Sequence, residues 1–314
     1  PSSSGDPEDI STQTSFVLQD NFMSYFIGNN EYEFLSISEN EMHVRVIQTE
    51  PSGATLAWYE KFSTINPNDE DGDCNGDTGE VGSGNNDVLI WAEEFETDGA
   101  PCSGIWNYDL GANGWGNGES QFYTNRPENI IIEDGLLKIT AIAESYEGSD
   151  YTSSRIQSKD KFAFKYGRIE ARAKLPEGGG TWPAIWMLGS NSGEVTWPNC
   201  GEIDILEHKG NNQDRIYGSL HYPGNSGGNS NTDSVSVPNV SSEFHLYEVQ
   251  WTASNINFLV DGEVYHTFSN NTNVPFNQDF YLLINVAMGG DFGGAIDPSF
   301  EQSTMEIDYI RVYQ

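Results

Sequence analysis

Basic residues are scarce in this chain. Its 314 residues include 14 lysines and arginines against 48 aspartates and glutamates, a formal net charge of 14 − 48 = −34. Nucleic acids and anionic membrane surfaces both attract basic patches, so we expect the chain to bind neither, and neutral or cationic ligands are easier partners. No run of about 18 apolar residues is present, so we expect no membrane span.

Cysteine is also rare, because the chain contains only Cys74, Cys102 and Cys200. Three cysteines allow at most one internal disulfide, and their spacing matches no zinc motif. The chain opens with neither an initiator methionine nor the apolar core of a signal peptide, from which we expect a processed export product. We therefore predict a monomer that is secreted or held at a bacterial cell surface, with Cys74 and Cys102 paired.

Long stretches with a 3.6-residue hydrophobic period are missing as well. From residue 88 to residue 314, strand patterns recur about every ten residues with turn residues between them. Residues 130–140 and 256–268 each read as a hairpin built on an Asp-Gly turn. Aromatic residues make up 12% of the chain and supply apolar area for a core. The pattern predicts an all-β sandwich over residues 88–314.

Two further segments precede this domain. Short runs of aromatic and β-branched residues predict three or four strands within residues 1–65, which we interpret as a small β-rich segment of a larger accessory module. Residues 66–87 are mostly glycine, aspartate and asparagine with almost nothing to bury, which is typical of a linker.

Three carboxylates stand out in the run Gly201-Glu-Ile-Asp-Ile-Leu-Glu-His. In a regular strand Glu202 and Asp204 share one face, whereas Glu207 points to the other. One extra residue at Ile205-Leu206, a β-bulge, would return Glu207 to the face of the first two acids. The alternative is an edge strand whose acids simply face solvent.

Three acids on one face suit glycoside hydrolysis with retention of configuration. In that reaction one carboxylate attacks the anomeric carbon while a second, kept protonated, donates to the leaving oxygen. A third acid between them raises the pKa of a neighbour and can orient the nucleophile.

With its flanks, this run resembles glycoside hydrolase family 16, laminarinase branch. The flanking motifs are Trp197-Pro-Asn-Cys-Gly-Glu-Ile-Asp, Gly180-Thr-Trp-Pro-Ala-Ile-Trp-Met-Leu, Gly218-Ser-Leu-His-Tyr and Gly118-Glu-Ser-Gln-Phe-Tyr-Thr. The resemblance covers about residues 88–314. It implies a concanavalin A-like β-jelly-roll with a concave substrate cleft and a retaining endo-β-1,3-glucanase. It further implies that Glu202 is the nucleophile, Glu207 the general acid/base and Asp204 the supporting acid.

The resemblance also nominates sugar-binding residues, since pyranose rings stack on indoles. The candidates are Trp182, Trp186, Trp197, Arg168, His221 and Asn125. Two of them have plain structural alternatives: Trp186 could be a core residue, and Arg168 could form an ion pair with Glu170.

The family finally implies a structural Ca²⁺ held by Glu94, through its backbone and in some cases its side chain, by the Gly135 carbonyl and by Asp308; catalysis needs no cofactor. The expected substrate is a laminarin-type β-glucan, because a sulfated polymer would need more basic residues than this chain has. Two alternatives stay open: a non-catalytic β-glucan-binding module, and a hydrolase of mixed-linkage β-glucan or agarose.

Overall fold

The computed structural model describes residues 24–27, 30–37, 41–49, 55–63 and 88–314. The chain divides into two compact units, Pro1–Asn68 and Asp69–Gln314. In the first unit, four antiparallel strands pair in sequence order: β1 (Ser24–Ile27), β2 (Asn30–Ile37), β3 (Glu41–Thr49) and β4 (Thr55–Ser63). The predicted linker, residues 66–87, lies outside the described residues, so its role stays a prediction.

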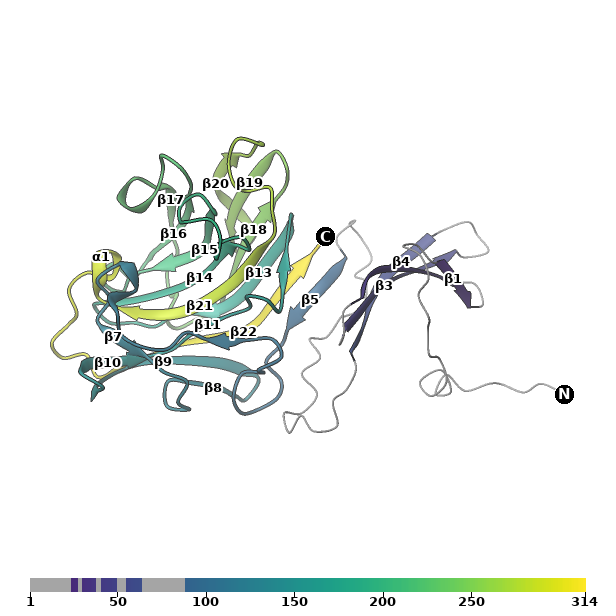
Figure 1. Cartoon of the computed structure of the whole chain (residues 1–314). Coiled ribbons are helices and arrows are strands. Elements are labelled where there is room, and N and C mark those ends of the chain that lie inside the picture. Colours follow the sequence, from purple (N-terminus) through teal and green to yellow (C-terminus); the bar gives the residue numbers. More distant parts are fainter. Residues whose placement is uncertain (1–23, 28–29, 38–40, 50–54, 64–87) are drawn as a thin grey trace. The chain divides into compact units, whose positions relative to one another are not determined.

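The second unit is a sandwich of two large sheets, which Figure 1 shows as two curved layers. The ten-stranded sheet follows the order β20 (Glu263–Ser269), β19 (Asn255–Val260), β18 (His245–Trp251), β13 (Gly167–Lys174), β22 (Gln302–Tyr313), β9 (Leu136–Tyr146), β10 (Ser149–Ser153) and β7 (Gln121–Tyr123), with β5 (Leu89–Glu93) beside β22 and β8 (Ile130–Glu133) beside β9.

The other layer has eight strands and one short helix near it. Its order is β17 (Asn231–Ser236), β16 (Arg215–His221), β15 (Glu202–His208), β14 (Thr181–Gly189), β21 (Phe280–Met288), β11 (Arg155–Gln157) and β6 (Asn107–Tyr108), with β12 (Ala163–Phe164) beside β21; the helix is α1 (Gly290–Gly293). The predicted all-β jelly-roll is confirmed, because strands far apart in sequence pair throughout both sheets.

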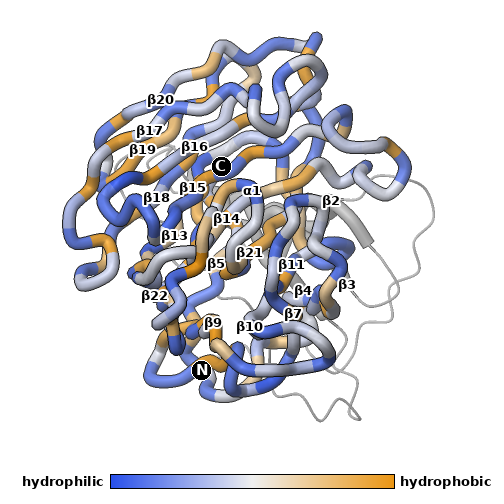
Figure 2. The backbone as a smooth tube through the Cα atoms, turned by 90° about the vertical axis from the view of Figure 1, so that its left-hand side faces the viewer, coloured by the Kyte–Doolittle hydropathy of each residue, from blue (hydrophilic) through white to orange (hydrophobic). Residues whose placement is uncertain are grey.

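The core lies between the two sheets. Each strand alternates, so one side chain in two points inward. Ile203 and Leu206 of β15 are fully buried there, as are Ile307 and Ile310 of β22. In Figure 2 the hydrophobic segments lie along strands such as β21 and β14. Burial of this apolar surface holds the two sheets face to face.

The outward face of the ten-stranded sheet is covered by ion pairs; we call it the ion-paired face. Arg311 Nε and Nη2 donate to the two carboxylate oxygens of Glu94 at 2.7 and 2.8 Å. Arg168 pairs with Glu170, and Lys174 Nζ lies 2.6 Å from Glu306. Strand β22, which runs through this face, is thereby tied to its neighbours by charge as well as by backbone hydrogen bonds.

Cysteine and helix content agree with the expectations above where the structure describes them. Cys102 is disulfide-bonded and Cys200 is a buried free thiol. Cys74 lies outside the described residues, so the expected pairing stays a prediction. Among the described residues, no helix has the length and apolar character that crossing a bilayer requires.

Candidate active site

The three acids of β15 lie on one face of the eight-stranded sheet, which we call the acid face. Pairing with β14 runs Leu188 to Glu202, Trp186 to Asp204 and then Ala184 to Glu207. The register shifts between Asp204 and Glu207 against both neighbouring strands. The predicted bulge is therefore confirmed: without it Glu207 would point into the core.

Two tryptophans hold the outer acids. Trp197 Nε1 donates to Glu202 Oε2 at 3.0 Å, and Trp182 Nε1 donates to Glu207 Oε1 at 3.1 Å. Glu207 receives a second hydrogen bond, from Ser219 Oγ to Oε2 at 3.0 Å. Glu207 is 8% exposed. An indole N–H can only donate, so these contacts fix each carboxylate in one orientation.

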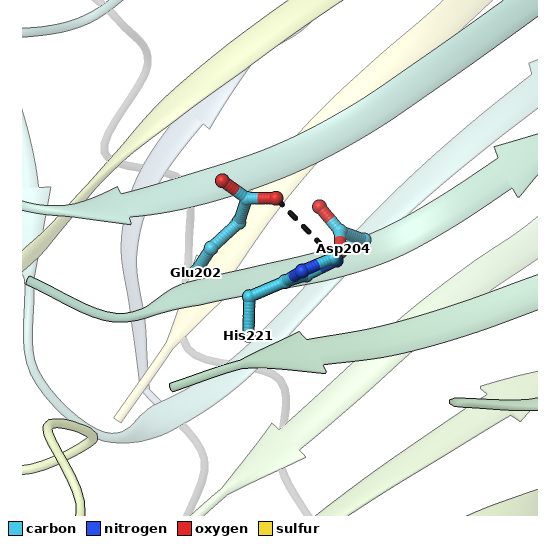
Figure 3. Close-up of side chains that lie close together, drawn as sticks. All are labelled: Glu202, Asp204 and His221. Carbon is cyan, nitrogen blue, oxygen red and sulfur yellow. Dashed lines mark ion pairs between the residues drawn. The ribbon is translucent and has the colours of Figure 1, made fainter. Parts of the chain in front are cut away.

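His221 of β16 faces the other two acids (Figure 3). Its Nε2 lies 3.1 Å from Asp204 Oδ2 and 3.6 Å from Glu202 Oε1. The other ring nitrogen, Nδ1, accepts a hydrogen bond from the Gly227 N–H at 3.1 Å. A nitrogen that accepts carries no proton, so the ring is the neutral tautomer with its proton on Nε2, directed at the acids.

Burial raises the pKa of all three acids, and repulsion from a neighbouring carboxylate adds to this for Glu202 and Asp204. Burial first, and then the Asp204 carboxylate, raise the pKa of Glu202 well above its usual range. Burial and Glu207 do the same to the pKa of Asp204. Burial raises the pKa of Glu207, against the lowering influence of His221, Ser219 and Trp182. Three such close carboxylates resist ionising together, so the cluster keeps its protons to a higher pH than isolated carboxyl groups would.

This arrangement places carboxyl groups that can ionise and carboxyl groups that can donate a proton on one surface. Ligand atoms of Glu202, Asp204 and His221 also lie within 4.8 Å of one another, a spacing that could suit a cation. Their contacts with each other and with the neighbouring indole account for that spacing, so we assign them to the acid cluster. Buried carboxylates that share protons are suited to general acid and nucleophilic catalysis.

The third predicted tryptophan, Trp186, lies on the same face. It pairs with Asp204 across the strands, and its Nε1 donates to Asn285 Oδ1 at 2.8 Å. The Arg155 guanidinium lies 4.8 Å from the Trp186 ring centre and 5.0 Å from that of Trp115. The ring is half-buried rather than in the core. The sugar contacts predicted for the three tryptophans stay predictions.

Two groups of aromatic residues near the acids were not predicted. Phe292 of α1 has its ring centre 5.2 Å from those of Trp182 and Tyr217, beside Glu207. Trp115 adopts a φ of 48°, which is rare for a residue with a side chain and is often kept for function. The only sequence signal was a local run of glycine around each aromatic, in Gly114-Trp-Gly and in Gly289-Gly-Asp-Phe-Gly-Gly.

The prediction that Arg168 lies beside the acids is wrong. Arg168 belongs to β13 of the ten-stranded sheet and lies on the ion-paired face, where it contacts Glu170 and Glu248 and sits over the Tyr313 ring. An alternating pattern predicts a strand but not the sheet that it joins. Asn125 is an exposed residue just after β7. In the part of the chain that the structure describes, it makes no contact with the acids.

The predicted calcium ligands are engaged with arginines. Both Glu94 carboxylate oxygens accept from Arg311, and the Asp308 carboxylate pairs with Arg172. These side chains fit a cation poorly, because a guanidinium already neutralises each charge. Backbone carbonyls, such as that of Gly135 in a positive-φ turn, would have to supply most of the ligands. The calcium site stays a prediction.

Comparisons with known proteins agree with this geometry. The family model "Glycosyl hydrolases family 16" matches residues 117–311, and the model "Beta-glucan synthesis-associated protein SKN1/KRE6/Sbg1" matches residues 14–198. A beta-glucanase of Rhodothermus marinus is 41% identical over 72% of this chain and 85% of its own. A glucan endo-1,3-beta-glucosidase A1 of Niallia circulans is 37% identical over 72% of this chain and 38% of its own. The solved laminarinase of Rhodothermus marinus superposes with a TM-score of 0.70 at 42% identity, covering 73% of this chain and 97% of its own.

Proposed function

Because the chain belongs to the glycosyl hydrolases of family 16, we propose that it is a retaining endo-β-1,3-glucanase acting on laminarin-type β-glucans. The observation that carries the proposal is the bulged strand β15, which turns Glu202, Asp204 and Glu207 to one face among hydrogen-bond donors. Relatives named as glucanases and a laminarinase structure support the substrate class.

The proposed reaction has two steps. In the first, Glu202 attacks the anomeric carbon, the glycosidic C–O bond breaks, and Glu207 gives its proton to the departing oxygen. In the second, Glu207 takes a proton from water, whose oxygen attacks the same carbon and displaces Glu202. Two inversions at one carbon restore the original configuration. Asp204 and His221 keep Glu202 in position throughout. Both lie against Glu202, and neither makes or breaks a covalent bond in either step.

A non-catalytic glucan-binding module is the second candidate from the sequence. A pure binder gains nothing from burying three acids together, since each raised pKa costs folding stability. The arrangement therefore favours an enzyme. Export, also proposed here, is supported by the disulfide at Cys102, because such bonds persist in oxidising compartments.

A polysaccharide panel tests the substrate. Laminarin, mixed-linkage β-glucan and agarose are incubated with the protein, and product sizes and anomeric configuration are followed by chromatography and NMR. We expect β-configured oligosaccharides of several lengths from laminarin. Binding of laminarin without any products over a long incubation would favour a non-catalytic binding module instead. Faster cleavage of mixed-linkage β-glucan or agarose would show that the faster-cleaved polymer, and not laminarin, is the preferred substrate.

Azide tests which acid has which role. In Glu202→Ala, azide can take the nucleophile's place, so an activated aryl glucoside should yield the α-glycosyl azide. In Glu207→Ala, the glycosyl-enzyme still forms, so azide should yield the β-glycosyl azide. The opposite pair of products would exchange the two roles.

A further inference from the structure

A row of three hydroxyl groups runs from Glu207 across the acid face. Ser219 Oγ donates to Glu207 Oε2 at 3.0 Å, Thr232 Oγ1 donates to Ser219 Oγ at 2.9 Å, and Ser230 Oγ lies 2.7 Å from Thr232 Oγ1. Ser219 of β16 and Thr232 of β17 are direct cross-strand partners, which places both side chains on one face. We call these three residues the hydroxyl row.

Counting protons gives the row a direction. Each hydroxyl has one proton to donate. The proton of Ser219 goes to Glu207 and that of Thr232 goes to Ser219, so Thr232 can only accept from Ser230. Every donor therefore points toward the carboxylate. A hydroxyl that accepts one hydrogen bond becomes a stronger donor for the next, so the outer members strengthen the contact at Glu207.

Only the member of the row next to Glu207 is fully buried. Ser219 is 2% exposed, whereas Ser230 is half-buried and Thr232 is exposed. A buried hydroxyl such as Ser219 needs a donor for its oxygen as well as an acceptor for its proton. Without Thr232, Ser219 could instead accept a proton from Glu207, which would hold that proton away from the sugar.

We propose that Thr232, which is two strands away from β15, is a positioning residue for Glu207 and acts through Ser219. Its hydrogen bond keeps the Ser219 proton directed at Glu207 Oε2, so that the acid's own proton is left for the leaving oxygen. This inference rests on the proposed glucanase activity and on Glu207 as the general acid.

The pH dependence of catalysis should report this contact. Other titratable groups that influence Glu207 are Asp204 and Glu202 on its own strand, His221 on β16, Lys209 after β15 and Tyr265 on β20. None of these is changed by the substitutions below. A hydrogen bond to the ionised carboxylate of Glu207 lowers the pKa of that group. Losing or weakening the bond therefore moves the basic limb of the kcat/KM profile to higher pH.

The row predicts a graded series. We expect Ser219→Ala to raise the basic limb by roughly one pH unit, since it removes a hydrogen bond to a charged group. Thr232→Val should raise it by about a few tenths of a unit, because it only weakens that bond. Ser230→Ala should do less, and Thr232→Ser, which keeps the hydroxyl, should restore the wild-type profile. Ser236→Ala, on the same strand but outside the row, is the matched control.

A second readout separates positioning from plain structural damage. An aryl glucoside with a strongly acidic phenol needs little help from a general acid, so its kcat/KM should be nearly unchanged in Thr232→Val. The same variant should lose about threefold to tenfold in kcat/KM on laminarin.

Three results would overturn the proposal: an unchanged basic limb in Ser219→Ala and Thr232→Val, an equal loss on both substrates, or no rescue by Thr232→Ser. Failure of the proposed function looks different, because the wild type would then release nothing from laminarin at any pH.

Discussion

The two sheets each carry a row of carboxylates on one face, but the neighbours of the two rows differ. On the ion-paired face, two arginines and a lysine from β13 meet Glu170, Glu306 and Asp308 directly. On the acid face, the neighbours within hydrogen-bonding distance are indoles, a hydroxyl and a neutral imidazole. The same residue type is structural beside a guanidinium and reactive beside a neutral donor, because only the guanidinium cancels its charge.

The difference between the two faces follows from where the few basic residues lie. Of only 14 lysines and arginines, Arg168, Arg172, Lys174 and Arg311 gather on the ion-paired face. Among the described residues, the only basic side chain at ion-pair distance from the β15 acids is His221, which is neutral. The chain thus stabilises one sheet with its few cations and leaves the acids of the other with raised pKa values.

The same substitution on the two faces should give opposite results. Glu202→Gln should lower glucanase activity by about three orders of magnitude or more, because the nucleophile is lost. It should also raise the free energy of unfolding by about 1 kcal/mol, since it removes a buried charge that its neighbours repel. Laminarin hydrolysis and thermal unfolding of the purified variant measure the two effects.

Glu170→Gln is the matched control, because Glu170 is 6% exposed and accepts hydrogen bonds from Arg168 and Tyr313. We expect kcat to stay within about twofold and the free energy of unfolding to fall by about 1–3 kcal/mol. Similar activity losses in both variants would contradict the division between the two faces.

Loss of an indole donor should have a smaller effect on catalysis. Trp182→Phe keeps a ring beside Phe292 but removes the N–H that holds Glu207, so we expect about a tenfold fall in kcat/KM on laminarin. Trp197→Phe should cost roughly threefold, because Trp197 is 44% exposed and water can replace its N–H. A larger loss from Trp197→Phe would show that its ring binds sugar.

The pH dependence of stability should also have opposite signs in two regions. Folding raises the pKa of Glu202 above its usual 4.5, so its folded form binds the proton more tightly and stability falls as pH rises through the range above 4.5. Glu144 behaves oppositely: the hydrogen bond from Arg126 lowers its pKa, so its contribution is present above 4.5 and is lost on acidification. Denaturation midpoints measured across about pH 4–8 should show that Glu202→Gln flattens the decline toward neutral pH. A curve parallel to that of the wild type would count against this interpretation.

The smallest effect should come from the Arg311–Glu94 pair of the ion-paired face. Arg311→Met removes both hydrogen bonds to Glu94 but keeps most of the apolar stem over Tyr309. Because the Arg311 side chain is 32% exposed, we expect a loss of about 1 kcal/mol, or roughly 2–4 °C in Tm, with unchanged kinetics. A fall in activity would show that the two faces are coupled.

The acid strand could be predicted from the sequence because its apolar residues and its three acids cannot all take their proper sides in a regular strand. Apolar residues fix the buried side of β15, and three acids can then share the other side only with a bulge, which the structure contains. Motifs close to the acids in sequence also singled out Trp182 and Trp197, but as sugar-stacking residues; their hydrogen bonds to Glu207 and Glu202 were not predicted.

Contacts made across strands could not be predicted in this way. Ser219 and Thr232 are common surface residue types, and their hydrogen bond depends on the register between β16 and β17. Arg168 was misplaced for a related reason: periodicity shows which side of a strand is buried but not which strands lie next to it.

The loop between β16 and β17, residues 222–230, contacts both ends of the acid cluster. Its Gly227 N–H sets the tautomer of His221, which faces Asp204, and its last residue, Ser230, begins the hydroxyl row that ends at Glu207. Changes in this loop would therefore reach both ends of the acid cluster through hydrogen bonds, without replacing any of the three acids. It offers laboratory evolution a short stretch in which the working pH of the enzyme can be adjusted.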